Sequence, residues 1–130
     1  MKLMRFLIII FILLFNIQSS YSYNNYYEAL EAAKKDDNRG ALFIFTGSWC
    51  NPCQRLKREI KPIISRLNKY TIVYFVDIDK ERKIADYYRK KGKLEGVPTY
   101  ILTDRKERSI LRIGSGYKSQ RDFIKWYSGK

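Results

Sequence analysis

The segment 49–53, with the sequence WCNPC, holds the two cysteines of this 130-residue chain and separates an apolar run from a helix-like pattern. Residues 41–46 are continuously apolar, as expected of a strand that is covered on both faces of a sheet. From Pro52 onward, apolar side chains recur at helical spacing, at Leu56, Ile60, Ile63, Ile64 and Leu67. Open α/β sheets place their functional residues at such strand-to-helix junctions. The segment therefore predicts an α/β fold with a site at this junction.

The spacing of the two cysteines is typical of a redox-active dithiol. Thiol–disulfide exchange needs one thiolate that attacks and a second thiol close enough to release the mixed disulfide. Cys50 would lie at the helix N-terminus, where free backbone N–H groups and the helix dipole stabilise a thiolate and lower the thiol pKa. Cys53, one turn further along, would be the less exposed resolving thiol.

Two other interpretations of the cysteine pair are a structural disulfide and half of a metal site. A closed zinc site takes four Cys or His ligands, and the chain has no histidine and no further cysteine. A disulfide that closes so short a loop removes little chain entropy from the unfolded state. We therefore expect a redox pair, with no metal and no cofactor.

The first residues have the order of a secretory signal peptide. Lys2 and Arg5 precede the apolar run 6–15, and a small polar stretch, 18–22, follows. This order predicts a signal peptide over residues 1–22 and one domain over residues 23–130, with cleavage before Tyr23 or, as an alternative, before Tyr21. The apolar run is shorter than the roughly 20 residues of a membrane span. An uncleaved anchor over residues 3–17 is the other interpretation.

Export to the periplasm or secretion affects the redox state that we expect for the two cysteines. Outside the cytosol, dithiols become oxidised unless a partner keeps them reduced. A protein of this kind would therefore need a membrane or soluble thiol redox partner in order to turn over.

The chain is strongly basic, with 26 Lys and Arg against 13 Asp and Glu and a net charge of +13. Removal of Lys2 and Arg5 with the signal peptide leaves +11, which is 13 minus 2. Such a surface favours an acidic partner or a membrane surface, and the alternative is a plain solvated basic surface. The basic residues are spread along the chain without a nucleic-acid motif, so nucleic-acid binding is not expected.

The remaining patterns predict alternating helices and strands after a linker over residues 21–27. The expected elements are helix 28–35, strand 41–46, a helix of about 16 residues from Pro52, strand 71–78, helix 79–91, an antiparallel hairpin of strands 97–102 and 109–113, and a last helix. Pro62 should bend the second helix near Lys61. Ser119 should cap the last helix, which has Phe123, Trp126 and Tyr127 on its apolar face.

This order, with WCNPC at the first strand-to-helix junction and the sequence GVPT at residues 96–99, resembles the thioredoxin superfamily from Glu28 to the C-terminus. Gly114 also lies where a glycine is common in the last strand of thioredoxins. The resemblance implies a thioredoxin-like fold, with a central mixed β-sheet flanked by helices, and protein thiol–disulfide oxidoreductase activity. It assigns Cys50 as the attacking cysteine, Cys53 as the resolving cysteine and Pro98 as the cis-proline that faces the disulfide.

The same resemblance implies three substrate-binding residues, Trp49, Val97 and Pro98. A cis bond before Pro98 would turn the Val97 backbone toward a substrate chain, and proline has no N–H that would compete beside the sulfurs. Trp49 would form one wall of the site, with ordinary core packing as the alternative for this residue. The expected substrates are exported proteins that contain disulfides.

The sequence departs from cytosolic thioredoxins at two positions behind the site. Their buried acid, thought to take the proton of the resolving thiol, is matched by Ile44, and the lysine near it by Phe75. Proton transfer from Cys53 would therefore go through water or the substrate. Asn51 and Pro52 lack the histidine of oxidising and isomerising relatives, which favours a reductase. The alternatives are an oxidase or isomerase, and a non-catalytic binding module with a basic surface.

Overall fold

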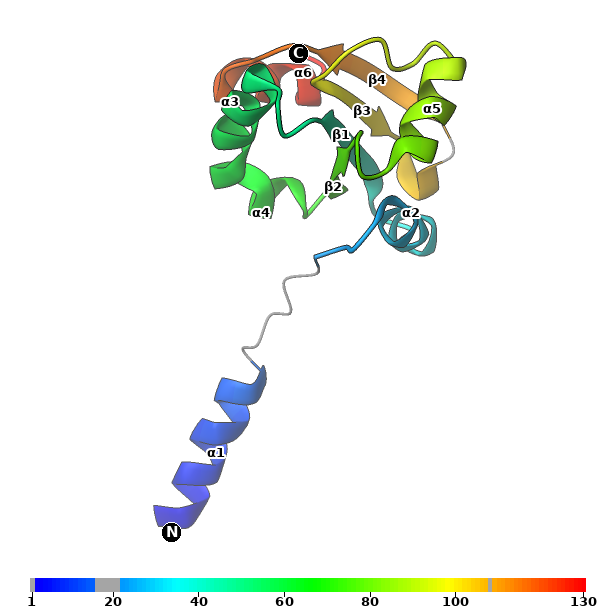
Figure 1. The fold of residues 1–130 in the computed structure, drawn as a ribbon. Helices are drawn as coiled ribbons and strands as arrows, with labels where there is room; N and C mark the ends of the chain where they lie inside the picture. The colour runs from blue at the N-terminus through cyan, green and yellow to red at the C-terminus, as the bar shows by residue number, and fades with distance from the viewer. Residues whose placement is uncertain (1, 16–21, 108) are drawn as a thin grey trace.

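The computed structural model of the chain describes residues 2–15, 22–107 and 109–130 (Figure 1). Helix α1 (Lys2–Phe15) contains the apolar run of the predicted signal peptide. Most of the predicted cleavage region, residues 18–21, lies outside the described residues. Over the three described ranges, no helix has both the length and the apolar character of a membrane span. The division of the chain at residue 22 stays a prediction.

The elements that follow α1 have the predicted order. They are α2 (Tyr26–Lys35), β1 (Gly40–Thr46), α3 (Asn51–Ile60), η1 (Lys61–Ile63), α4 (Ile64–Leu67), β2 (Thr71–Asp77), α5 (Arg82–Lys90), β3 (Thr99–Thr103), η2 (Arg105–Glu107), β4 (Ile110–Ser115) and α6 (Gln120–Ser128). The predicted long helix is divided at η1, a 3-10 turn that contains Pro62, because proline cannot donate the backbone hydrogen bond of a regular helix.

The strands form one mixed four-stranded sheet with the order β2-β1-β3-β4. β1 pairs in parallel with β2 and antiparallel with β3, and β3 and β4 form the predicted antiparallel hairpin. β1 therefore lies in the interior of the sheet, and all of its residues are buried. The functional segment 49–53 begins a few residues after this strand ends.

Helices cover both faces of the sheet (Figure 1). Side chains of a strand alternate between faces, and in β1 Phe43 and Phe45 pack with α2 and α5, whereas Leu42 and Ile44 pack with α3, α4 and α6. This two-sided burial explains why the predicted strand 41–46 is apolar at successive positions. The result is a three-layer α/β arrangement.

The predicted strand 97–102 begins only at Thr99, so Val97 and Pro98 precede β3. Two predicted helix boundaries were wrong as well, and the first concerns the linker over residues 21–27. α2 begins at Tyr26, because the Asn25 side chain accepts a hydrogen bond from the Glu28 backbone N–H at 3.0 Å and caps the helix. Tyr26 is buried, and its ring packs against Phe43 with 4.7 Å between centroids. This part of the expected linker therefore belongs to the core.

The second wrong boundary is the start of the helix predicted over residues 79–91. α5 begins only at Arg82, because Asp77 Oδ1 accepts hydrogen bonds from the backbone N–H groups of Asp79, at 2.9 Å, and Lys80, at 3.2 Å. An aspartate that bonds the backbone two residues ahead stabilises a turn in place of a helix. The turn leaves Asp79 beside the functional segment, as described below.

Candidate redox site

Cys50 and Cys53 are joined by a disulfide across the first turn of α3, with their Cα atoms 5.2 Å apart. Cys50 is the N-cap of α3, and its Sγ accepts a hydrogen bond from the Cys53 backbone N–H at 3.2 Å. Backbone N–H groups in the first turn of a helix have no intrahelical partner. One of these donors therefore points at Cys50 Sγ, in a position that stabilises negative charge on this sulfur after reduction.

The two cysteines differ slightly in exposure to solvent. Cys53 is completely buried, at 0% exposure, whereas Cys50 retains 5%. This difference agrees with the expectation that Cys53 is the less exposed cysteine. Cys50 is therefore the less deeply buried residue of the pair.

The loop before β3 lies against the disulfide. Val97 O is 3.6 Å from Cys50 Sγ, and the Val97–Pro98 peptide bond is cis. The Gly116 backbone N–H donates to Pro98 O at 2.9 Å, which fastens this loop to the end of β4. The fold therefore brings Val97 and Pro98, predicted from a motif more than 40 residues along the chain, next to Cys50.

Trp49 projects from the surface beside the disulfide. Its side chain is 65% exposed, so the alternative of ordinary core packing is wrong. The indole Nε1 donates a hydrogen bond to Asp79 Oδ2 at 2.8 Å, and a Cβ at Gly47 would lie only 2.9 Å from the ring. The ring is therefore held in place between Gly47 and the turn that follows β2.

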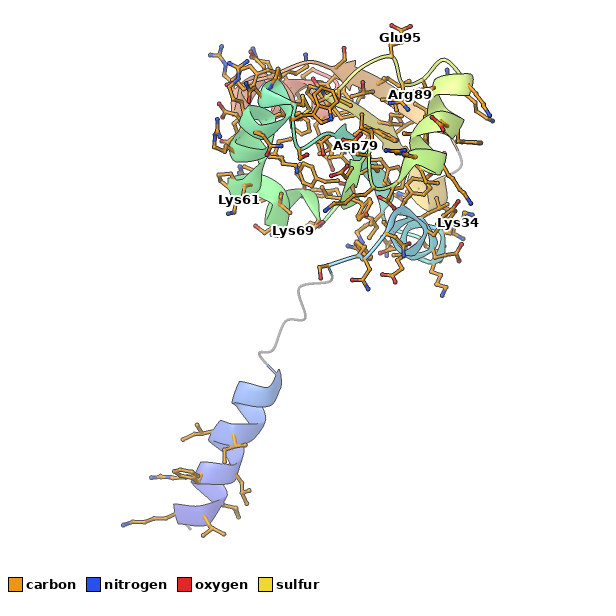
Figure 2. The ribbon with its side chains drawn as sticks, viewed as in Figure 1. Lys34, Lys61, Lys69, Asp79, Arg89 and Glu95 are labelled. Carbon is orange, nitrogen blue, oxygen red and sulfur yellow. A yellow bond between two sulfur atoms is a disulfide. The ribbon has the colours of Figure 1, made fainter. Side chains whose placement is uncertain are left out.

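Asp79 was missed as a site residue, because the sequence pattern placed it in a helix. The signal that could have identified it is the pair of aspartates at 77 and 79, since Asp77 has the side chain that forms an Asx turn. Figure 2 labels Asp79 on the connection between β2 and α5.

A groove of about 490 Å³ adjoins the disulfide loop, and we call it the site groove. The segment 92–99, including Val97 and Pro98, forms one side, and Ile113, Ser115 and Gly116 form the other. Glu95 lines the groove as well and points away from the domain in Figure 2. Val97 therefore connects the site groove with the disulfide, because it lines the groove and its carbonyl oxygen lies 3.6 Å from Cys50 Sγ.

The end of β4 and the loop after it are fixed by two tyrosines. Burial raises the pKa of Tyr100 to about 12, and its hydroxyl donates to Ser115 O at 3.1 Å. The Tyr117 hydroxyl donates to Glu59 Oε1 at 2.7 Å, a bond that raises the pKa of Tyr117 and ties this loop to α3. Both phenols are neutral at physiological pH, so these contacts do not change with ordinary variations in pH.

The two sulfurs supply the chemistry of this site. Within the described residues, no group of three or more Cys, His, Asp or Glu side chains is placed to hold a metal ion. What the arrangement offers is a pair of thiols that can close to a disulfide and reopen, next to a groove and an exposed aromatic ring.

The fold and the site together define a thioredoxin-like domain with a C-x-x-C disulfide at the junction of its central strand and α3. The family model described as "Thioredoxin-like domain" matches residues 26–128. The chain therefore belongs to the thioredoxin-like domain family, as its sequence predicted.

Relatives and solved structures agree with this assignment. Thioredoxin-1 of Drosophila melanogaster is 25% identical over 92 residues, which cover 71% of this chain and 79% of that protein. The thioredoxin-related protein DsbJ of Chlamydia pneumoniae is 31% identical over 102 residues, which cover 70% of this chain but only 29% of that protein. The crystal structure of the germline-specific thioredoxin Deadhead (Thioredoxin-1) of Drosophila melanogaster matches with a TM-score of 0.65 and 20% identity, covering 80% of this chain and 90% of that one. Family membership and the paired cysteines support thiol–disulfide oxidoreductase activity.

Proposed function

We propose that this protein is an exported thiol–disulfide oxidoreductase that reduces disulfides in other exported proteins. The observation that carries the proposal is the position of the Cys50 sulfur, which caps α3 and lies 3.6 Å from the carbonyl oxygen of Val97, a residue that lines the site groove. A substrate sulfur would approach Cys50 along this groove. Cys53 is completely buried, so its proposed role is to attack the Cys50 sulfur from inside the pair.

The proposed reaction has two exchange steps. The Cys50 thiolate attacks one sulfur of the substrate disulfide, which forms a mixed disulfide and releases the other substrate sulfur as a thiolate that takes up a proton. The Cys53 thiolate then attacks Cys50 Sγ, closes the Cys50–Cys53 disulfide and releases the second substrate thiol. Two electrons pass from the cysteine pair to the substrate, and a membrane or soluble thiol partner must return them.

Three further residues are proposed to contact the substrate. Val97 offers its backbone to an extended substrate segment, and Pro98 next to it has no N–H that would compete for the acceptors of that segment. Trp49, held by Asp79 and largely exposed, provides an aromatic wall on the other side of Cys50.

The direction of electron flow and the export of the protein rest on the sequence. Asn51 and Pro52 between the cysteines lack the histidine of oxidising relatives, which favours reduction. Residues 1–22, with Lys2 and Arg5 before the apolar run, support export by a signal peptide, followed by a domain over residues 23–130.

Trapping of mixed disulfides tests the reaction directly. A Cys53→Ala variant can form the mixed disulfide but cannot release it, so we expect covalent adducts on Cys50 that disappear on treatment with dithiothreitol. The Cys50→Ala variant is the matched control, because it keeps one thiol of the pair in the less exposed position. Equal amounts of adduct on both variants, or none on either, would contradict the proposal.

A redox titration of the full-length protein against glutathione and dithiothreitol tests the direction. We expect a potential near the reducing end of known dithiol couples, about −270 mV. A value near the oxidising end, about −120 mV, would favour an oxidase or isomerase instead. Full biological activity of a Cys50→Ser, Cys53→Ser double variant would favour the third alternative, a binding module in which the disulfide takes no part in the function.

A further inference from the structure

A second groove, of about 650 Å³, lies between α2 and α5 and extends to the start of β4. Four tyrosines and four lysines are among its lining residues, and we call it the tyrosine–lysine groove. Its lysines are Lys34, Lys83, Lys91 and Lys93.

The base of the tyrosine–lysine groove is buried, and its edges are exposed. Tyr26 and Tyr88 are each buried to 5% exposure, and their hydroxyl oxygens lie 2.8 Å apart in a hydrogen bond. Tyr27 and Tyr87, by contrast, are 60% and 51% exposed, and Ile110 is 40% exposed. Exposed aromatic and apolar side chains around a buried base are typical of binding surfaces, because they lose little conformational entropy on contact.

All the charged side chains that line this groove are positive. The residues that line it, all within the described ranges, include no acid. Lys34 has a distant ion pair with Glu31 at 3.8 Å, and Lys91 Nζ lies 4.8 Å from the centre of the Tyr87 ring. A ligand with carboxylates would therefore meet concentrated positive charge next to aromatic surface.

The tyrosine–lysine groove and the site groove are neighbours. Lys93 lines both, and β4 runs along both, with Ile113 in the site groove and Ile110 in the tyrosine–lysine groove. Three residues of an extended strand span about 10 Å. A substrate segment that leaves Cys50 through the site groove therefore reaches the lysines after several residues.

We propose that the tyrosine–lysine groove binds an acidic segment of the polypeptide whose disulfide reacts at Cys50. This inference rests on the proposed function and specifies the class of its substrates. The lining cations are lysines, compact charges that attract carboxylates and phosphates alike. The polypeptide is favoured because Lys93 lines both grooves and the site groove leads to Val97, next to the disulfide.

The test compares two synthetic peptides with the same disulfide, one with glutamates several residues from the reactive cysteine and one with glutamines there. The reduced full-length protein should reduce the acidic peptide at least about fivefold faster, as expected from a few exposed charge pairs.

In the triple variant Lys83→Gln, Lys91→Gln, Lys93→Gln this preference for the acidic peptide should disappear. The control variant Lys61→Gln, Lys69→Gln, Lys125→Gln removes the same charge elsewhere, and Figure 2 shows Lys61 and Lys69 far from Lys34 on α2. The control should keep the preference.

A preference that survives in the groove variant, or that falls equally in both variants, would overturn the proposal. If neither peptide is reduced, the proposed function fails, and binding then tests the groove separately. A cysteine-free acidic peptide with a fluorescent label should bind the oxidised full-length protein and lose at least about fivefold in affinity in the groove variant only. Unchanged binding in that variant, or equally tight binding of a single-stranded oligonucleotide of the same charge, would overturn the inference.

Discussion

Ile44 of β1 lies directly opposite Phe75 of β2 in the parallel strand pair behind the redox site. Ile44 is completely buried and packs in one cluster with Leu56 and Ile60 of α3, the helix whose first turn contains Cys53. Lys57 of the same helix has its Nζ 5.4 Å from the centre of the Phe75 ring. The interior at this strand pair is therefore apolar, where cytosolic thioredoxins have an acid and a lysine.

We expect this apolar pair to make the rate at which Cys53 releases the mixed disulfide strongly dependent on pH. Without a carboxylate at position 44, the Cys53 proton must leave to water or to the substrate. The thiolate fraction of any thiol rises about tenfold per pH unit as long as the pH lies below its pKa. Single-turnover reduction of a peptide disulfide, followed between pH 6 and 8, should show a release phase with this slope. The Cys53→Ala variant should lack the phase, and a rate that stays flat over this range would contradict the prediction.

Gly114→Ala should destabilise the fold, because β4 crosses the Tyr100 ring at this glycine. A Cβ there would overlap Tyr100 Cε2 and lie 2.8 Å from Trp126 Nε1. Overpacking of this kind costs about 1–3 kcal/mol of the free energy of unfolding, which urea denaturation measures. Gly96→Ala is the matched control, because no atom lies within 4 Å of its Cβ, and it should change stability by less than about 0.5 kcal/mol. Equal effects of the two substitutions would contradict this account.

The sequence predicted the fold well because its strongest signals depend on burial. The apolar run of β1 and the helical spacing of Leu56, Ile60 and Leu67 reflect two-sided and one-sided burial, and all these residues are in the core. Boundaries were less predictable, since they depend on single polar contacts. Asn25 extends α2 and Asp77 shortens α5, each through one side-chain oxygen that binds the backbone.

The site was predicted only in part, for a related reason. Cys50, Cys53 and Pro98 belong to motifs with fixed spacing, so their proximity follows once the family is identified. The Trp49–Asp79 hydrogen bond joins residues 30 positions apart and depends on where the turn after β2 ends. The tyrosine–lysine groove combines side chains of α2, α5 and β4 that have no shared pattern along the chain.

The Trp49–Asp79 hydrogen bond leads to a prediction about the order of the indole ring. Asp79→Ala should let the largely exposed ring rotate more freely, because Nε1 loses the acceptor that holds it 2.8 Å away. Time-resolved fluorescence anisotropy in a Trp126→Phe background should show a larger fast component. Stability should fall by less than about 1.5 kcal/mol, as expected for one exposed hydrogen bond. Lys80→Ala, next to Asp79 in the same turn, is the control, and the same anisotropy change in both variants would argue against a specific role of Asp79.

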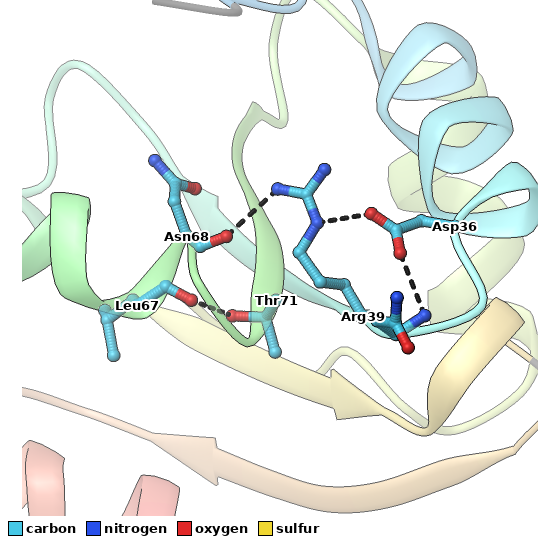
Figure 3. A network of polar contacts seen from close by, with 6 residues as sticks. Asp36, Arg39, Leu67, Asn68 and Thr71 are labelled. Atoms are coloured by element: carbon cyan, nitrogen blue, oxygen red, sulfur yellow. Dashed lines mark hydrogen bonds and ion pairs between the residues drawn. The ribbon is translucent and has the colours of Figure 1, made fainter.

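Asp36 and Arg39 connect two turns at the opposite end of the sheet (Figure 3). Arg39 Nε donates to Asp36 Oδ2 at 2.5 Å, and Arg39 Nη1 donates to Asn68 O at 3.0 Å. The turn between α2 and β1 is thereby linked to the turn between α4 and β2. The hydrogen bond from Arg39 is the main cause that lowers the pKa of Asp36 below its ordinary value of 3.8.

This lowered pKa predicts how Asp36→Asn will behave with pH. A carboxyl whose pKa is lower in the folded state stabilises the fold above its unfolded pKa, and this contribution is lost as the pH falls through the folded pKa. The variant should therefore be less stable than the wild type at pH 7, by at most about 1 kcal/mol for a partly exposed pair, and should approach it near pH 2. Urea denaturation at a series of pH values measures the difference. Asp86→Asn is the control, because it removes the more exposed ion pair with Arg89, and it should lower stability less at pH 7. If Asp36→Asn is less stable than the wild type by the same amount from pH 2 to pH 7, the charge of the Asp36 carboxylate does not stabilise the fold.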